Sequence, residues 1–594
     1  MAPMAGLVRG NPARRGGHRL PSALAALVAT LGLGIAAAQA APPTDPAAAP
    51  AAPASAPAPG HLFGEYLAAH HAQQVRDFRA AAGLFDKALA ADPSAPELIS
   101  RSFLMDVSTG QFDRARALAP QELKLDPSDA LAELVLLIDR LKAGDSAAAV
   151  KYAAALPSDG VHRFIGPFAL AWTRMAAGDL AGADAALQGL DKFPGFQPLK
   201  AFQLGLLYDF AKQPDKAQQF FDAALKASPE LNWRLTDAIA NFDERHGRAE
   251  QAKALYQRFI KQNSGSDLAL SVAAARPPGP PQPVIGSAAD GLAESLFDLA
   301  SVLNQAETVD LALVYDRFAL ALRPSFPLAQ LLLADLLSAE KKPEESLSVL
   351  AEIPAGSPYS WSARLRATAN LDTLERSDEA IAQLQAMASE KPSLAGAEVQ
   401  LGDILRVKKR FSEAVSAYDE AIRRAAAAGL PERWTLFYDR GVVLERSGQW
   451  QRAEGDLLHA LKLKPDQPMV LNYLGYSWID RGENLQRGLK MIEKAVELQP
   501  EDGYIVDSLG WAHYRMADYA GAVKYLEKAI ELVPEDPTIN DHLGDAYWRA
   551  GRLVEARYQW RRALQFGPQQ SDIKPIEAKL EHGLNVSVSR PRGG

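Results

Sequence analysis

The 594-residue sequence predicts an all-α solenoid of about fourteen two-helix units arranged in two blocks. Three observations predict this fold. Small residues recur about every 34 residues, a second set of small residues lies twelve or thirteen positions upstream, and prolines share the same period. A period of this length indicates stacked structural repeats, because one such unit cannot bury its apolar faces without neighbours.

The first set of small residues is almost entirely alanine. Its steps are 34 or 35 residues, except for one step of 60 and one of 39. A complete register that persists through insertions indicates a repeat and not merely an alanine-rich composition. Its members are Ala81, Ala115, Ala149, Ala183, Ala217, Ala252, Ala312, Ser346, Ala380, Ala414, Ala453, Gly488, Ala522 and Ala556.

The second set is rich in glycine, which costs about 1 kcal/mol relative to alanine inside a helix and persists where another helix must come close. Its glycines are Gly205, Gly402, Gly441, Gly475, Gly510 and Gly544. Apolar residues between these marks keep a helical spacing, and the periodic prolines stop one helix and suit the first turn of the next. Each unit is therefore predicted to be a helix, a short turn and a second, antiparallel helix.

The pattern in one unit reads Leu509-Gly510, then Tyr519, Ala522, Leu526, Ala529 and Pro534. This pattern resembles the tetratricopeptide repeat (TPR), and the resemblance covers about residues 65 to 570. It implies a right-handed α-solenoid in which the first helix of each repeat lines a concave surface. Within bacteria, the chain looks like the secreted TPR proteins of the cell envelope.

The step of 60 residues suggests where the two blocks divide. Its extra residues include the proline-rich run ARPPGPPQPVIGS, which forms either a hinge, a strap packed on the superhelix or a tolerated loop insertion. The predicted organisation is a signal peptide at 1–40, a Pro/Ala-rich spacer at 41–60, an N-terminal TPR block of about six degenerate repeats at 61–263, a Pro-rich linker at 264–290, a C-terminal TPR block of about eight repeats at 291–570, and a capping helix with a disordered tail at 571–594.

The N-terminus predicts export to the periplasm. Arg9, Arg14, Arg15 and Arg19 precede an apolar stretch that ends in Ala38-Gln39-Ala40, an A-x-A type cleavage site. An uncleaved leader, which would anchor the chain to the inner membrane, is the alternative. No later segment of the sequence is long and apolar enough to span a membrane.

Composition and motifs argue against several classes of function. The net charge of −8 disfavours general nucleic-acid binding, and the absence of cysteine removes disulfides, thiol catalysis and cysteine-based metal sites. The sequence contains no H-E-x-x-H, G-x-x-x-x-G-K or G-x-S-x-G motif. We therefore expect no enzymatic activity, no catalytic residues, no metal and no cofactor.

The predicted function is a non-enzymatic scaffold or adaptor of the bacterial cell envelope that binds a peptide or protein in its concave groove. The alternatives are a TPR protein that assists polysaccharide export and contacts glycan directly, and a membrane-anchored cytoplasmic scaffold. The candidate groove residues are rich in Tyr, Trp and Arg, which dominate binding hot spots. They are Tyr438, Asn472, Tyr473, Tyr476, Asp507, Trp511, Tyr514, Arg515, Asp541, His542, Asp545, Trp548 and Arg549.

Overall fold

A computed structural model describes residues 59–584 except 194, 264–265, 276–278, 280 and 306–307. The predicted signal peptide, nearly all of the spacer and the last ten residues lie outside the described part. In that part the secondary structure consists of thirty α-helices and one short 3-10 helix, without a β-strand. None of the described helices combines the length and the apolar character needed to cross a bilayer. The all-α prediction is confirmed.

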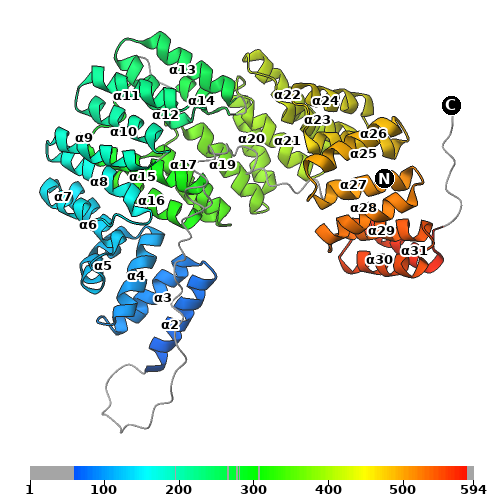
Figure 1. Ribbon diagram of the computed structural model, residues 1–594, viewed down its shortest axis with the longest axis horizontal. Coiled ribbons are helices and arrows are strands. Elements are labelled where there is room, and N and C mark those ends of the chain that lie inside the picture. The colour runs from blue at the N-terminus through cyan, green and yellow to red at the C-terminus, as the bar shows by residue number, and fades with distance from the viewer. Residues whose placement is uncertain are drawn as a thin grey trace, which may run out of the picture. The chain divides into compact units, whose positions relative to one another are not determined.

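The chain forms two compact units, described over 59–380 and 381–584, which divide inside α20 (Figure 1). Helices of the first unit are α2 (Pro59–Gln74), α3 (Phe78–Ala91), α4 (Pro96–Thr109), α5 (Phe112–Leu125), α6 (Ala130–Lys142), α7 (Ser146–Ala155), α8 (His162–Ala176), α9 (Leu180–Gln188), η3 (Gly189–Lys192), α10 (Gln197–Phe210), α11 (Pro214–Ala227), α12 (Trp233–Arg245), α13 (Ala249–Gln262), α14 (Leu268–Ala275), α15 (Ala288–Gln305), α16 (Val309–Leu322), α17 (Pro327–Ala339), α18 (Pro343–Ala351), α19 (Ser360–Thr373) and the start of α20 (Ser377–Glu390).

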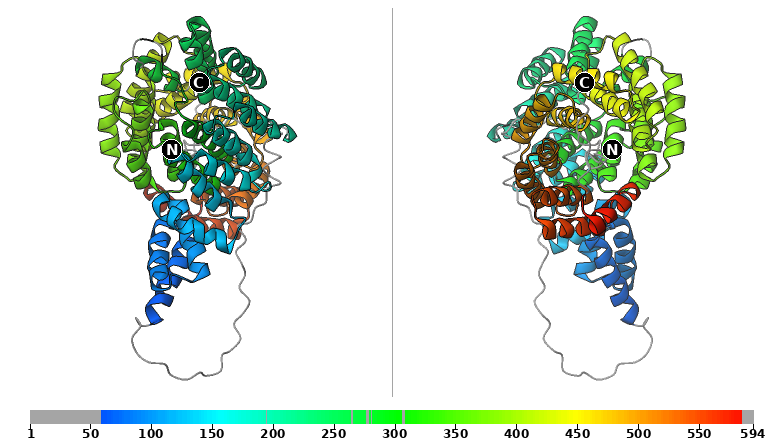
Figure 2. Two further views of the ribbon diagram at one scale, coloured as in Figure 1. Left: turned by 90° about the vertical axis from the view of Figure 1, so that its left-hand side faces the viewer. Right: turned by 90° about the vertical axis from the view of Figure 1, so that its right-hand side faces the viewer.

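The second unit contains the rest of α20 and the C-terminal repeats. Its helices are α21 (Gly396–Val407), α22 (Phe411–Ala427), α23 (Trp434–Arg446), α24 (Trp450–Leu463), α25 (Pro468–Arg481), α26 (Leu485–Leu498), α27 (Gly503–Arg515), α28 (Tyr519–Leu532), α29 (Pro537–Arg549), α30 (Leu553–Gln565) and α31 (Gln570–His582). Among the described residues, contacts define thirteen pairs of consecutive helices, and α14, α19, α20 and the predicted capping helix α31 lie outside these pairs. Successive pairs stack side by side within each unit (Figure 2).

Close approach inside each pair explains the two small-residue registers. A Cβ atom added at Gly205 would lie 2.4 Å from the ring of Phe221, which is on the second helix of the same pair. At Gly544 the corresponding distance to the Trp560 ring is 2.5 Å. Glycine on the first helix therefore admits a large side chain from the second, and this contact fills the interior of the pair.

The first pair of the second block, α15–α16, packs into the N-terminal repeats. Figure 1 shows α15 and α16 beside α6 and α8, and α15 also contacts α10. Trp172 of α8 is fully buried and donates its indole N–H to Ser295 of α15 at 3.1 Å. A Cβ atom at Gly291 would lie 2.2 Å from the Trp172 ring, so this glycine allows α15 to reach α8.

A buried ionic network holds α15 in this position. Arg234 of α12 donates to both carboxylate oxygens of Glu294 at 2.7 and 2.5 Å, and Arg323 donates to the same carboxylate at 3.1 Å. Burial raises the pKa of Glu294, although both guanidiniums oppose that rise. Burial and the nearby Glu294 carboxylate also raise the pKa of Asp298 to about 7. Side chains of α15 thus occupy the face of α8, α10 and α12 that the repeat pattern assigns to the concave side.

Because α15 packs into the N-terminal repeats, the predicted linker, 264–290, lies inside the first compact unit. The boundary between the two units is at 380/381 instead. The linker contains a helix, α14, which contacts α19, and Asn241 of α12 donates to the carbonyl oxygen of Gln282 at 2.9 Å. These contacts favour the strap over the hinge. The first unit also contains ion pairs between the two predicted TPR blocks. Arg76 and Arg79 of the N-terminal block pair with Glu340 and Glu345 of the C-terminal block at 2.8 and 3.0 Å, respectively.

We predict that Gly291→Leu destabilises the first unit by about 1–3 kcal/mol or more, because the new side chain collides with a Trp172 ring that has no room to move. Gly83→Ala is the matched control: Gly83 lies in α3, and no atom lies within 4 Å of the point that an added Cβ would occupy, so alanine should stabilise the chain by about 0.5–1 kcal/mol. Urea unfolding followed by circular dichroism measures both. Equal stability of Gly291→Leu and the wild type would contradict the assigned contact.

Candidate protein-interaction surface

All thirteen predicted groove residues lie on first helices of the unit at 381–584. Tyr438 lies on α23, and α25 carries Asn472, Tyr473 and Tyr476; α27 carries Asp507, Trp511, Tyr514 and Arg515, and α29 carries Asp541, His542, Asp545, Trp548 and Arg549. Six are buried, namely Tyr438, Asn472, Tyr473, Asp507, His542 and Asp545. The other seven are half-buried or exposed. Their use in partner binding remains a prediction.

The buried residues link one first helix to the next. The residue three positions before the register glycine of each repeat reaches toward the following first helix, and we call each such contact a rung. The rings of Tyr438 and Tyr473 meet edge to face at 6.0 Å, and Asp507 pairs with Nδ1 of His542 at 3.0 Å. In the last rung Asp541 accepts from Lys579 of α31 at 2.8 Å. These rungs tie consecutive repeats together through polar and aromatic side chains.

One rung is incomplete. Asn472 occupies the rung position of α25, and the equivalent partner on α27 is Ser508, whose hydroxyl instead donates to the carbonyl oxygen of Tyr504 at 3.0 Å. Asn472 is fully buried, and neither its Oδ1 nor its Nδ2 has a hydrogen-bond partner within the described part of the chain. Most buried polar groups in proteins are hydrogen-bonded, so an amide without a partner requires an explanation.

Two further polar atoms on neighbouring first helices share this condition. Oγ1 of Thr435 on α23 and Nε1 of Trp511 on α27 are buried, and neither is hydrogen-bonded to any residue that the structure describes. Thr435 lies six positions before its register glycine, Asn472 three before and Trp511 one after. These spacings place all three on one side of their helices, along a diagonal that crosses α23, α25 and α27. We call them the unpaired diagonal.

Aromatic stacking covers the C-terminal end of the surface. The Trp511 ring stacks on His542 at 4.0 Å and on Tyr514 at 4.7 Å. The Trp548 ring lies 5.4 Å from the buried Trp560 ring. A Cβ atom added at Gly583 would lie 2.0 Å from the Trp548 ring. The end of α31 therefore packs directly on Trp548. This tryptophan has a packing role that its groove position alone did not indicate.

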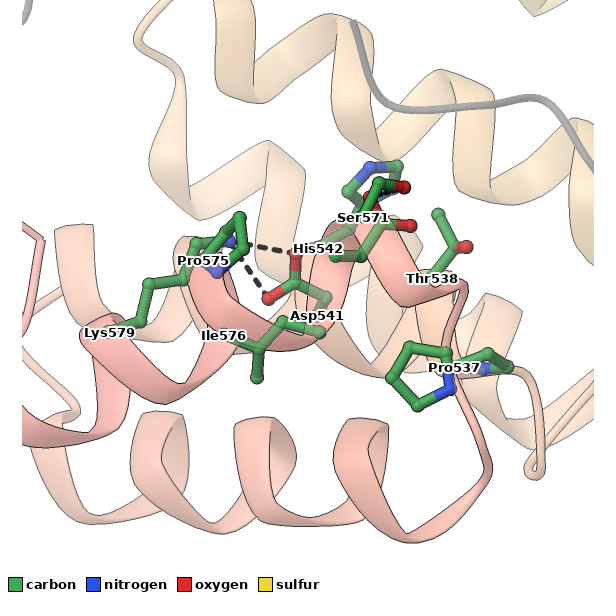
Figure 3. Close-up of a pocket in the computed structure, with 10 residues that line it drawn as sticks. Pro537, Thr538, Asp541, His542, Ser571, Pro575, Ile576 and Lys579 are labelled. Atoms are coloured by element: carbon green, nitrogen blue, oxygen red, sulfur yellow. Dashed lines mark hydrogen bonds and ion pairs between the residues drawn. The ribbon is translucent and has the colours of Figure 1, made fainter.

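A pocket of about 340 Å³ opens between α29 and α31 (Figure 3). Its walls include Pro537, Pro575 and Ile576, and its ionisable side chains are Asp541, His542, Asp572 and Lys579. Figure 3 shows Lys579 reaching from α31 to the carboxylate of Asp541, and its ammonium group also donates to Asp545 at 2.9 Å. Nowhere in the described ranges do three His, Asp or Glu side chains converge in a way that could hold a metal ion.

Comparison with known proteins identifies the type of repeat. A tetratricopeptide-repeat family model matches residues 399–468 and 508–571, and a second one matches 201–231. Tetratricopeptide repeats are therefore present in this chain. It is 31% identical over 194 residues to TPR repeat-containing protein PA4667 of Pseudomonas aeruginosa, an alignment that spans 32% of this TPR chain and 31% of that protein's own length.

Solved structures with similarity to this TPR chain include the Cut9-Hcn1 hetero-tetramer of the APC/C, with 14% identity, coverage of 88% of this chain and 96% of that one, and a TM-score of 0.39. MamA from Desulfovibrio magneticus is 21% identical, with 29% and 94% coverage and a TM-score of 0.26. PilF of Pseudomonas aeruginosa is 20% identical, with 31% and 82% coverage and a TM-score of 0.28.

The last repeats of the TPR array carry an electrostatic cluster around His542. Burial opposes the charged imidazolium, but the Asp507 carboxylate, with Asp541 and Asp545, outweighs burial and raises the pKa of His542. Burial and the Asp541 charge raise the pKa of Asp545 to about 6, against the opposing effect of Lys579. The cluster therefore holds buried charges of both signs, and His542 joins α27 to α29.

Lys579 is the main residue of this cluster that sequence reasoning missed. Ile576 of the capping helix α31 is buried. Lys579 follows Ile576 by three residues and so shares its side of the helix. This spacing indicated that Lys579 faces the neighbouring repeat. Which carboxylates it pairs with depends on how α31 docks, and the spacing does not show that.

We predict that the coupling energy between Asp507 and His542 depends on pH. The folded-state pKa of His542 lies above its unfolded value, so its stabilising effect is complete below about pH 6.5 and is lost as pH rises through the folded pKa. A double-mutant cycle of Asp507→Asn and His542→Gln should give about 1.5–3 kcal/mol in acid and less in alkali. A coupling energy that stays constant from about pH 5.5 to 9 would show that the pair is not ionic.

Proposed function

We propose that this chain is an exported scaffold of the bacterial cell envelope that holds an extended segment of a partner protein on the first helices of its C-terminal repeats. TPR proteins are typically protein-interaction scaffolds, which supports the general class of function. The partner segment, the site and the cell compartment are the proposed parts.

The unpaired diagonal is the observation that carries this proposal. Leaving a buried donor or acceptor unpaired costs about 1–3 kcal/mol, so a partner that supplies the missing hydrogen bonds would recover that free energy. An extended peptide exposes backbone N–H and C=O groups along its length. In the free chain these four polar atoms are covered, so binding requires groove side chains to move aside.

The geometry of the diagonal suits an extended segment. Successive members advance by three and four residues along their helices, which is about 4.5 and 6 Å. Packed helices lie about 8–10 Å apart, so each step across the surface is about 10–12 Å. Extended chain rises about 3.3 Å per residue, and each step therefore corresponds to three or four residues of the partner. A segment of about seven residues would reach from Thr435 to Trp511.

The first unit is a poorer candidate for the same role. The equivalent face of α8, α10 and α12 is already in contact with α15, and the indole N–H of Trp172 is hydrogen-bonded to Ser295 and Gln203. On that face the Trp172 indole and the Gln203 amide oxygen satisfy each other, whereas Thr435 Oγ1, the Asn472 amide and Trp511 Nε1 have no partner among the described residues. The proposal therefore assigns binding to the unit at 381–584.

We predict that Asn472→Leu preserves or slightly raises stability but weakens binding of groove peptides at least about tenfold, or 1.4 kcal/mol, because it removes only unpaired atoms. Peptides would be selected from a displayed random library on the full chain, and synthetic copies titrated by fluorescence anisotropy. Urea unfolding would give the stabilities.

Asn540→Leu is the matched control. Asn540 is equally buried and its Oδ1 also lacks a partner among the described residues, but its Nδ2 donates to the carbonyl oxygens of Pro534 and Asp536 at 3.2 and 2.7 Å. Its loss should cost about 1–3 kcal/mol of stability. If Asn472→Leu destabilises the chain as much as Asn540→Leu, Asn472 has a structural role. If no selected peptide binds Asn472→Leu more weakly than wild type, the groove proposal fails.

The proposed export to the periplasm is supported by the N-terminal basic residues and by the apolar stretch that follows them and ends at Ala40. We predict that a reporter active only outside the cytoplasm gains activity when fused after Ala40. Leu31→Arg with Leu33→Arg interrupts the apolar stretch and should abolish that activity. Equal reporter activity with and without the two arginines would reject a leader in this segment.

A further inference from the structure

The outer face of α30 exposes a cluster of large apolar side chains. Val554 is 80% exposed, Tyr558 55% and Leu553 43%. Val554 and Tyr558 are four residues apart and so lie one above the other on the helix. Single exposed apolar residues are ordinary on protein surfaces, but adjacent ones on one helix face indicate an interaction site more often.

Other repeats of the same unit provide an internal comparison. Val554 and Tyr558 lie two positions before and two positions after the small register residue, Ala556. The same two positions on the four preceding second helices are also exposed. They hold Ser412 and Ser416 on α22, Gln451 and Gly455 on α24, Gln486 and Lys490 on α26, and Ala520 and Lys524 on α28. Both positions thus face outward, and α30 alone among these helices fills both with large apolar side chains.

Arginines surround the apolar pair. Arg561 is exposed one turn beyond Tyr558, and Arg557 lies 4.9 Å from the Trp548 ring. Arg562 donates to the carbonyl oxygen of Pro534 at 2.9 Å and keeps its charge. The nearest carboxylate on the helix, Glu555, is already paired with Arg552 at 3.0 Å. We call Leu553, Val554 and Tyr558, with Arg557, Arg561 and Arg562, the α30 patch.

We propose that the α30 patch docks an acidic protein segment that carries an apolar side chain. Valine, leucine and tyrosine would bury the apolar side chain, and the guanidiniums would pair with carboxylates on either side of it. Tyrosine and arginine are enriched among residues that dominate binding energy. The positive rim stands out in a chain of net charge −8, so charge complementarity selects an acidic partner.

A flat anionic membrane is a poorer occupant than a protein segment. On the second helices of the neighbouring repeats the exposed carboxylates are paired with lysines: Glu497 lies 3.0 Å from Lys494 on α26, and Glu531 lies 3.6 Å from Lys528 on α28. A bilayer broad enough to cover several repeats would therefore meet charges of both signs and not a continuous positive face. A short segment contacts α30 alone. This inference does not depend on the proposed groove, because the α30 patch lies on a second helix and the unpaired diagonal on first helices.

The test compares the full chain with a variant that copies the preceding repeat. Val554→Gln with Tyr558→Lys reproduces Gln486 and Lys490 of α26 and changes only exposed atoms, so stability should be unaffected, as a thermal melt would verify. Displayed random dodecapeptides would be selected in parallel on wild type and on this variant. Synthetic copies of the enriched peptides would then be titrated by fluorescence anisotropy at low and high salt.

We expect wild type alone to enrich peptides with Asp or Glu around an aliphatic or aromatic residue. Such peptides should bind the double variant and Arg561→Glu at least about tenfold more weakly, lose affinity in high salt, and bind Asn472→Leu normally. Selections that do not differ between wild type and double variant, or that yield basic peptides, overturn the proposal. If wild type is a dimer in light scattering and the double variant is a monomer, the patch binds a second copy of the chain. If wild type floats with anionic vesicles and the double variant does not, the patch binds a membrane. Either result also overturns the proposal.

Discussion

The close approach of two helices within each pair is the contact on which the rest of the structure depends. Gly544 meets Trp560, and Gly205 meets Phe221, at distances that leave no room for a Cβ atom. Because the pair is this tight, its two helices act as one flat element whose remaining apolar surface can be buried only against the next pair. Stacking then places all first helices of the C-terminal unit side by side, and the rungs follow from that alignment.

The same constraint explains why the two units use their concave side chains differently. An insertion after α13 gives α15 enough chain to pack across α8 and α10, where Gly291 permits contact with Trp172. Once Glu294 is buried, it must keep Arg234 and Arg323 as partners, because an unpaired buried charge is strongly destabilising. The first unit therefore uses its concave side chains for internal contacts. In the second unit, Thr435, Asn472 and Trp511 keep buried polar atoms without hydrogen-bond partners among the described residues, on one side of three successive first helices.

Sequence periodicity predicted the fold and the helix face of each candidate residue, because a 34-residue register and helical spacing together determine which side of a helix a residue occupies. Trp511 and Asp507 were placed correctly on α27 by this reasoning. Periodicity carries no information on how deeply a side chain is buried. Several candidates are buried because a side chain of a neighbouring repeat packs on them or bonds to them. Lys579, the docking of α15 and the unpaired state of Asn472 depend on distant segments, which no local pattern records.

The rungs also limit which groove residues can contact a partner. Asp507 and His542 satisfy each other at 3.0 Å in a buried setting, so a ligand that took either one would leave the other charge unpaired at a cost of several kcal/mol. Lys579 is likewise shared between Asp541 and Asp545. Asn472 has no such commitment, because Ser508 turns its hydroxyl to its own helix. Recognition is therefore least costly at the incomplete rung, where a partner adds hydrogen bonds without breaking any.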